Sequence, residues 1–161
     1  MRLKTKIITY VSIVLVCLVL AIAFIVFLVI QPNRLEKLMR ATMLKVAGSV
    51  VYEVGLQLEN NDSERFSKLS RRLIRLEDVY GLSVYDLKGR LHFSSQYMTI
   101  LAPKLSPETY QHVFQDQQDL FVEEVIDQQN MLSLFYPIVE DDRLLGALTL
   151  TFTVESLLAY R

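Results

Sequence analysis

The residues best suited to bind a small molecule lie close together in the middle of the chain. Arg90, His92 and Ser94 alternate with Leu91 and Phe93 in the sequence RLHFSS. In a β-strand this alternation puts the three polar side chains on one side of the sheet. Arg90 and His92 could then hold a carboxylate through charge-assisted hydrogen bonds. A strand whose polar side simply faces water explains the same pattern.

Aromatic residues could form the walls of a pocket around these polar groups, with residues 96–105 as a lid over it. The aromatic candidates are Tyr97, Tyr110, Phe121, Phe135 and Tyr136. Ordinary core packing explains them equally well. The predicted ligand-binding residues are therefore Arg90, His92, Ser94, Tyr97, Tyr110, Phe121 and Tyr136.

Other chemistry finds little support in the sequence. It has no glycine-rich phosphate loop, no metal-binding pair of histidines or cysteines and no nucleophile elbow. The one cysteine, Cys17, lies in an apolar stretch, which excludes a disulfide or thiol chemistry in the polar part of the chain. Glu140, Asp141 and Asp142 fit a polar turn better than a calcium site, which needs about six or more oxygen ligands. We therefore expect no catalytic residue, no metal and no cofactor.

An apolar stretch near the N-terminus predicts a transmembrane helix. Residues 7–30 carry no charge, and a helix of that length covers roughly 36 Å, enough for a bilayer core of about 30 Å. Arg2, Lys4 and Lys6 precede the stretch, and residues 21–23 read Ala-Ile-Ala, so a cleaved signal peptide is the alternative. The stretch exceeds the roughly 7–15 apolar residues of a signal peptide, which favours an uncleaved anchor in the lipid bilayer.

The remainder, residues 31–161, is acidic. It holds all 18 acidic residues and all but three of the 17 basic ones, so its net charge is about −4. This balance argues against nucleic acid as a partner. The segment over 63–79 is basic instead. Its basic side chains form a stripe that could contact anionic lipid or an acidic partner, or could simply face water. The stripe consists of Arg65, Lys68, Arg72 and Arg75.

The hydrophobic pattern of residues 31–161 predicts an α+β domain. Helical spacing gives a long helix over 33–59 and an amphipathic one over 63–79. Small residues at Gly48, Ser49 and Gly55 would let the same helix of a second subunit approach, which indicates a homodimer. A period of two predicts five antiparallel strands that helices must cover. The strands are expected at 81–86, 90–95, 120–127, 131–139 and 143–153, with a short helix from Ser106 to about Gln115 and a closing helix from 154.

The segments GLSVYDLKGRLHFSS and LSLFYPIVEDDRLLGALTLTF resemble the PAS-like extracytoplasmic sensor domains of the PDC or single Cache type. Asp86 and Gly89 match the Asp-x-x-Gly hairpin of that family. Its last pair of strands is matched by Tyr136, Pro137, Ile138 and Gly146. The resemblance implies an N-terminal transmembrane helix, a long juxtamembrane helix and a five-stranded antiparallel sheet with flanking helices.

The same resemblance implies a place and a role. Residues 1–6 would be cytoplasmic, 7–30 would span the bacterial inner membrane, and 31–161 would form a periplasmic or extracellular sensor domain. In that family a second membrane helix and a cytoplasmic kinase, cyclase or methyl-accepting domain follow. We therefore expect the signal-input region of a receptor, such as a two-component sensor histidine kinase, that recognises an unidentified small molecule.

Two other functions remain open at this point. The chain could be a standalone anchored interaction module, for example a regulator of an envelope enzyme. A type IV pilin-like subunit also joins an apolar helix to a sheet, but its processing site is absent, and no acidic residue precedes Glu36.

Overall fold

The computed structural model describes residues 2–76, 79–95, 98, 102, 105–126 and 128–153. In the first helix, side chains are described at 14–25 and from 37 onward. The chain divides into two compact units, Met1–Met39 and Arg40–Arg161. Where the sequence predicted one helix over 7–30 and another over 33–59, the structure has a single helix, α1, over Arg2–Glu59.

Within the side chains that the structure describes, no helix offers an apolar stretch long enough to cross a membrane. The predicted span lies partly outside these side chains, since those of residues 7–13 and 26–30 are not among them.

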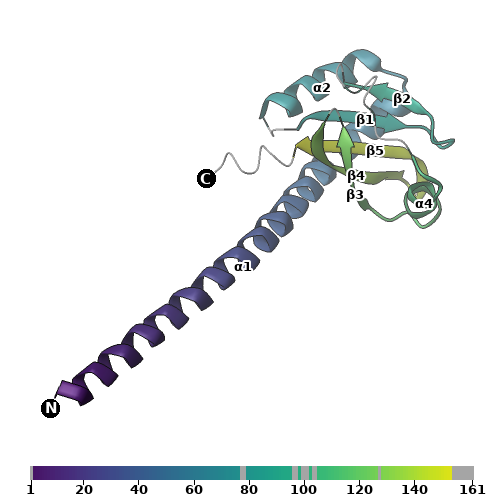
Figure 1. Cartoon of the computed structure of the whole chain (residues 1–161). Helices are drawn as coiled ribbons and strands as arrows, with labels where there is room; N and C mark the ends of the chain where they lie inside the picture. Colours follow the sequence, from purple (N-terminus) through teal and green to yellow (C-terminus); the bar gives the residue numbers. More distant parts are fainter. Residues whose placement is uncertain are drawn as a thin grey trace. The chain divides into compact units, whose positions relative to one another are not determined.

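The second unit contains a five-stranded antiparallel sheet in the order β2-β1-β5-β4-β3 (Figure 1), which confirms the predicted α+β class. Its strands are β1 Gly81–Tyr85, β2 Leu91–Ser94, β3 Leu120–Ile126, β4 Gln129–Glu140 and β5 Arg143–Thr153. The order places β5, the last strand in the sequence, at the centre of the sheet between β1 and β4.

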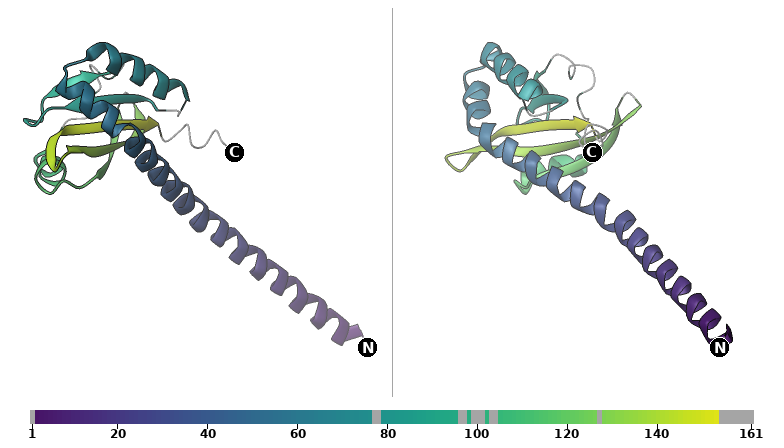
Figure 2. Two further views of the ribbon diagram at one scale, coloured as in Figure 1. Left: turned by 180° about the vertical axis from the view of Figure 1, so that it is seen from behind. Right: turned by 90° about the vertical axis from the view of Figure 1, so that its left-hand side faces the viewer.

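One face of the sheet packs against the last turns of α1 and against α2, Ser63–Leu76. Ile138 on β4 lies against Gly55 of α1, and Phe93 on β2 stacks on Phe66 of α2 with ring centroids 5.2 Å apart. Figure 2 shows α2 lying along the strands at the β1 and β2 end of the sheet. The side chains that point to this face are nearly all apolar, because two helices exclude water from it.

The opposite face packs against a short helical segment that precedes β3. The sequence predicted one helix there, but the structure has an α-helical turn, α4 Pro107–Tyr110, followed by a π-helix, η1 Gln111–Gln115. Val113 and Phe114 of η1 pack on Tyr85, Phe135 and Ala147 of the sheet. Both faces are therefore covered, and alternate residues of the central strands enter two different cores.

Polar side chains fix the ends of these elements where the sequence predicted breaks. The carboxylate of Asp62 accepts the N–H of Arg65 (3.0 Å) at the start of α2, and the hydroxyl of Ser106 accepts the N–H of Thr109 (3.0 Å) at the start of α4. Asp141 and Asp142 have φ angles of 48° and 59°. Two positive φ angles match the two-residue turns that join β-hairpins, so the acidic segment is the predicted turn.

Candidate functional site

Four hydroxyl side chains form a buried row across the middle of the sheet. Ser83 on β1, Thr149 and Thr151 on β5 and Ser133 on β4 have 0% of their surface exposed. Ser83 pairs with Thr149, and Thr149 pairs on its other side with Phe135, so the row lies on the face covered by η1. We call these four residues the hydroxyl row.

Half of the hydroxyl row is satisfied and half is not. Ser133 Oγ and Thr151 Oγ1 are 3.0 Å apart and hydrogen-bond to each other. Ser83 Oγ and Thr149 Oγ1 are buried, and neither has a hydrogen-bond partner among the residues that the structure describes. Each such group costs about 1–3 kcal/mol of folding free energy. Groups of this kind in a native core call for an explanation, and a bound polar molecule is one.

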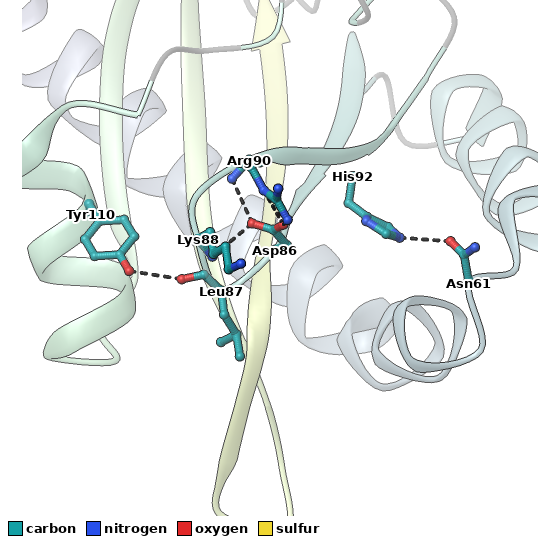
Figure 3. A network of polar contacts seen from close by, with 7 residues as sticks. All are labelled: Asn61, Asp86, Leu87, Lys88, Arg90, His92 and Tyr110. Atoms are coloured by element: carbon teal, nitrogen blue, oxygen red, sulfur yellow. Dashed lines mark hydrogen bonds and ion pairs between the residues drawn. The ribbon is translucent and has the colours of Figure 1, made fainter.

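Aromatic side chains border the hydroxyl row on the side of α4 and η1. The rings of Tyr85 and Phe135 lie 6.1 Å apart, and Tyr110 stacks on Phe114 at 4.8 Å. The Tyr110 hydroxyl donates to the carbonyl oxygen of Leu87 (3.0 Å), so it ties α4 to the β1–β2 turn (Figure 3). Aromatic rings thus line this end of the site, and the hydrogen bond of the Tyr110 hydroxyl is directed out of it.

The segment after β2 borders the other end of the hydroxyl row. Ser95 Oγ accepts the N–H of Leu82 (3.1 Å), and the N–H of Met98 donates to the carbonyl oxygen of Ser95 (2.8 Å). Met98 is fully buried against Gly81, where a Cβ would overlap its side chain. The predicted lid, residues 96–105, lies mostly outside the described residues, but its described part does reach this face of the sheet.

The pKa values of two ionisable groups on the same face are raised. Burial raises the pKa of Tyr85, and the charge of Glu124 raises it further. Burial also raises the pKa of Glu124 on β3 above 4.5. Burial therefore disfavours a negative charge at these two side chains.

Replacing Glu124 with glutamine is expected to stabilise the protein at pH 7. Because the folded state raises the pKa of this carboxyl, the folded state binds its proton more tightly than the unfolded state. Stability then falls as the pH rises from about 4.5 through the raised pKa, and glutamine removes that loss. Urea unfolding at pH 7 should show a higher midpoint for Glu124→Gln, and the gain should vanish at pH 3.

Glu123→Gln is the control, since its side chain is 71% exposed on the same strand. Its midpoint should change little at either pH. A gain for Glu124→Gln that persisted at pH 3 would show that the gain does not come from the buried charge.

The polar part of the predicted site does not converge. Arg90 forms an ion pair with Asp86 (2.8 Å), while His92 lies 3.0 Å from the side-chain oxygen of Asn61 (Figure 3). Burial acts to raise the pKa of Asp86, but hydrogen bonds from Arg90 and Lys88 outweigh it and lower that pKa. Arg90 thus stabilises the hairpin turn, and His92 joins β2 to the turn between α1 and α2.

The aromatic part of the predicted site is divided between the two faces. Tyr110 lies on the face of the hydroxyl row, whereas Tyr136 alternates with Phe135 and so points to the other face. Phe121 also lies on that other face, with the guanidinium of Arg40 4.7 Å from its ring centroid. Ser94 is half-buried beside Ser83 across the β1–β2 pair, and Tyr97 lies outside the described residues.

Sequence reasoning missed the hydroxyl row. A signal was present, because Ser133, Thr149 and Thr151 alternate with leucine or phenylalanine in strands that are otherwise apolar. In a sheet covered on both sides, such alternation puts hydroxyls in a core rather than in water.

No protein-family model and no curated protein matches the sequence. Among the solved structures that match are three at 13–14% identity. The E. coli DcuS sensor domain has a TM-score of 0.53, with 72% of this chain and 89% of that chain covered. The sensor domain of the V. cholerae histidine kinase DctB has a TM-score of 0.58, with 79% and 55% covered. The ligand-binding domain of the Pseudomonas aeruginosa PAO1 amino acid chemoreceptor PctC, in complex with GABA, has a TM-score of 0.55, with 79% and 57% covered.

The domain has the PAS-like fold of the PDC or Cache type. This confirms the fold that the resemblance implied. The Cache-type domain matches nearly all of the DcuS structure but little more than half of the DctB and PctC structures. At this level of identity the likeness concerns the fold, so the hydroxyl row of the Cache-type domain must be judged on its own geometry.

Proposed function

We propose that this chain is the signal-input region of a bacterial membrane receptor and that it binds a small polar molecule over the hydroxyl row. The fold carries the proposal, since the three similar structures are sensor or ligand-binding domains. The two buried, unpartnered hydroxyls of Ser83 and Thr149 support it. A ligand with its own hydrogen-bonding groups would satisfy both and would be oriented by them.

The proposal includes the membrane anchor. Residues 7–30 would cross the bacterial inner membrane, with residues 1–6 in the cytoplasm and the Cache-type domain on the periplasmic or extracellular side. The length of residues 7–30 and the absence of charge in them support this arrangement. The output would be a cytoplasmic domain of the same receptor, most simply a histidine kinase, as in the DctB protein.

A homodimer through α1 would let the domain pass on a signal. Ala41, Lys45, Gly48, Tyr52 and Leu56 are exposed at helical spacing, and Gly48 has no atom near its missing Cβ. A second α1 could pack along this stripe. Since α1 also packs on the sheet through Gly55, a ligand that favours one arrangement of sheet and helix would shift the populations of two dimer states.

Calorimetric titration of the 161-residue chain in lipid nanodiscs tests the proposal. A panel of amino acids, small carboxylates and sugars should contain at least one saturable ligand, and Thr149→Val should weaken its binding about tenfold through the lost hydrogen bond. Absence of any ligand in the panel would overturn direct sensing and favour the standalone regulatory module. Equal affinity in the variant would place the ligand elsewhere.

A further inference from the structure

A hollow lies on the other side of the sheet from the hydroxyl row, between the end of α1 and the face of α2. It consists of two adjoining parts of about 260 Å³ and 250 Å³ that share Glu53 and Arg65 in their linings. Both lie within the second unit of the chain. The hydroxyl row lies on the opposite face, so the two sites are separate.

The charge of this α1–α2 groove differs from that of the domain around it. Helix α2 has five basic residues and one acidic residue, while residues 31–161 as a whole carry a net charge of about −4. Arg65, Lys68 and Arg72 repeat at intervals of three and four, so they lie on one side of α2, and all three line the groove. Glu53 and Asp62 also line the groove, so its lining keeps a small excess of positive charge, which attracts an anion to this place on an acidic domain.

The ion pairs already present in the groove are weak. Arg72 lies 3.5 Å from Glu53, Arg65 lies 3.3 Å from Asp62 and Lys68 lies 2.7 Å from Glu64, and the three basic side chains are 58%, 77% and 66% exposed. Exposed pairs of this kind contribute at most about 1 kcal/mol. A dianion could replace them at small cost and accept bidentate hydrogen bonds from both guanidinium groups.

A buried amide provides a second and independent feature. Gln57 is 3% exposed, and it lines the groove beside Arg65. Its Nε2 donates a long hydrogen bond of 3.4 Å to Glu53, while its Oε1 has no partner among the described residues. A buried carbonyl oxygen needs a donor, which an inorganic anion such as sulfate does not have.

We propose that the α1–α2 groove binds a phosphate ester that carries a hydroxyl group. The phosphate would lie against Arg65, Lys68 and Arg72, and the hydroxyl would donate to Oε1 of Gln57. Two hollows of this volume suit a small soluble molecule, such as a polyol phosphate. The same chemistry occurs in the glycerol phosphate headgroup of an anionic lipid, so the experiment separates the two sources.

Glycerol 1-phosphate is the probe for the soluble source. Titrated into the full chain in phosphatidylcholine nanodiscs, it should give saturable NMR shifts at Gln57 and Arg72. Arg72→Gln should weaken binding about tenfold, since it removes a charge-assisted hydrogen bond. Arg71→Gln is the matched control, because Arg71 adjoins Arg72 on α2, has a similar charge and bonds the carbonyl oxygen of Ser67 rather than lining the groove.

Sulfate is the probe for the role of Gln57. Gln57→Leu should weaken glycerol 1-phosphate and leave the affinity for sulfate unchanged. Equal loss for both anions would overturn the hydroxyl contact, and equal loss in the Arg71 and Arg72 variants would overturn the groove. Shifts caused only by phosphatidylglycerol in the nanodisc would overturn the soluble source and assign the groove to a lipid headgroup. No saturable shift with either source would overturn the site altogether.

Discussion

Replacing Gly146 with alanine is expected to destabilise the domain by about 2–3 kcal/mol, near the upper end of overpacking costs in a close-packed core. Gly146 lies in the central strand β5, where a Cβ would overlap the carbonyl oxygen of Tyr85 on the neighbouring strand β1. The same Cβ would lie 3.0 Å from Cδ2 of Leu58 on α1. The leucine could turn away, but the carbonyl belongs to a paired backbone and cannot move without breaking the β1–β5 register.

Gly48→Ala is the matched control for this substitution. Gly48 lies on the exposed side of α1, and an added Cβ would meet no neighbouring element of the same chain within 4 Å, so alanine there should stabilise the helix of the monomer by up to about 1 kcal/mol. Urea unfolding of the detergent-solubilised chain, followed by tyrosine fluorescence, compares the two variants. Closely similar midpoints for Gly146→Ala and the unmodified chain would contradict the close contact between β1, β5 and α1.

The order of elements could be predicted from the sequence because local signals mark each of them. Gly89, with a φ of 71°, closes the β1–β2 turn, and Ser106 followed by Pro107 starts α4. Strand β5 was predicted with the bounds that the structure shows, since apolar residues and threonine alternate from 148 to 153 and a turn precedes Arg143. These signals depend only on neighbours in the sequence.

The site could not be predicted in the same way, because it depends on which strands are neighbours. Phe121 and Tyr136 both follow a period of two. That period does not say which face of the sheet η1 covers and which face α1 covers. Placing Ser83 beside Thr149 requires β5 to insert between β1 and β4. That pairing is a long-range choice set by packing of the whole domain.

Replacing Thr149 with valine is expected to stabilise the ligand-free domain by about 1–3 kcal/mol and to weaken its binding of ligand. Valine has nearly the shape of threonine, so the core stays filled while the unpartnered hydroxyl disappears. Removing a polar group that serves binding should raise stability and weaken binding. The free-energy cost of burying its hydroxyl is offset only when a ligand forms a hydrogen bond with it.

Thr151→Val makes the same chemical change two residues further along β5 and on the same face, but with the opposite expected sign. The Thr151 hydroxyl bonds to Ser133 at 3.0 Å, so valine would leave the Ser133 hydroxyl buried and unpartnered and should destabilise the domain by about 1–3 kcal/mol. Urea midpoints of the two variants, measured without ligand, should therefore lie on opposite sides of the unmodified chain. If both variants were destabilised alike, Thr149 would have a partner in the folded domain and would be a structural residue. If the two urea midpoints shift in opposite directions, the buried hydroxyls that reduce stability are those of Ser83 and Thr149, where the proposed ligand would bind. The hydroxyls of Ser133 and Thr151 then stabilise the domain.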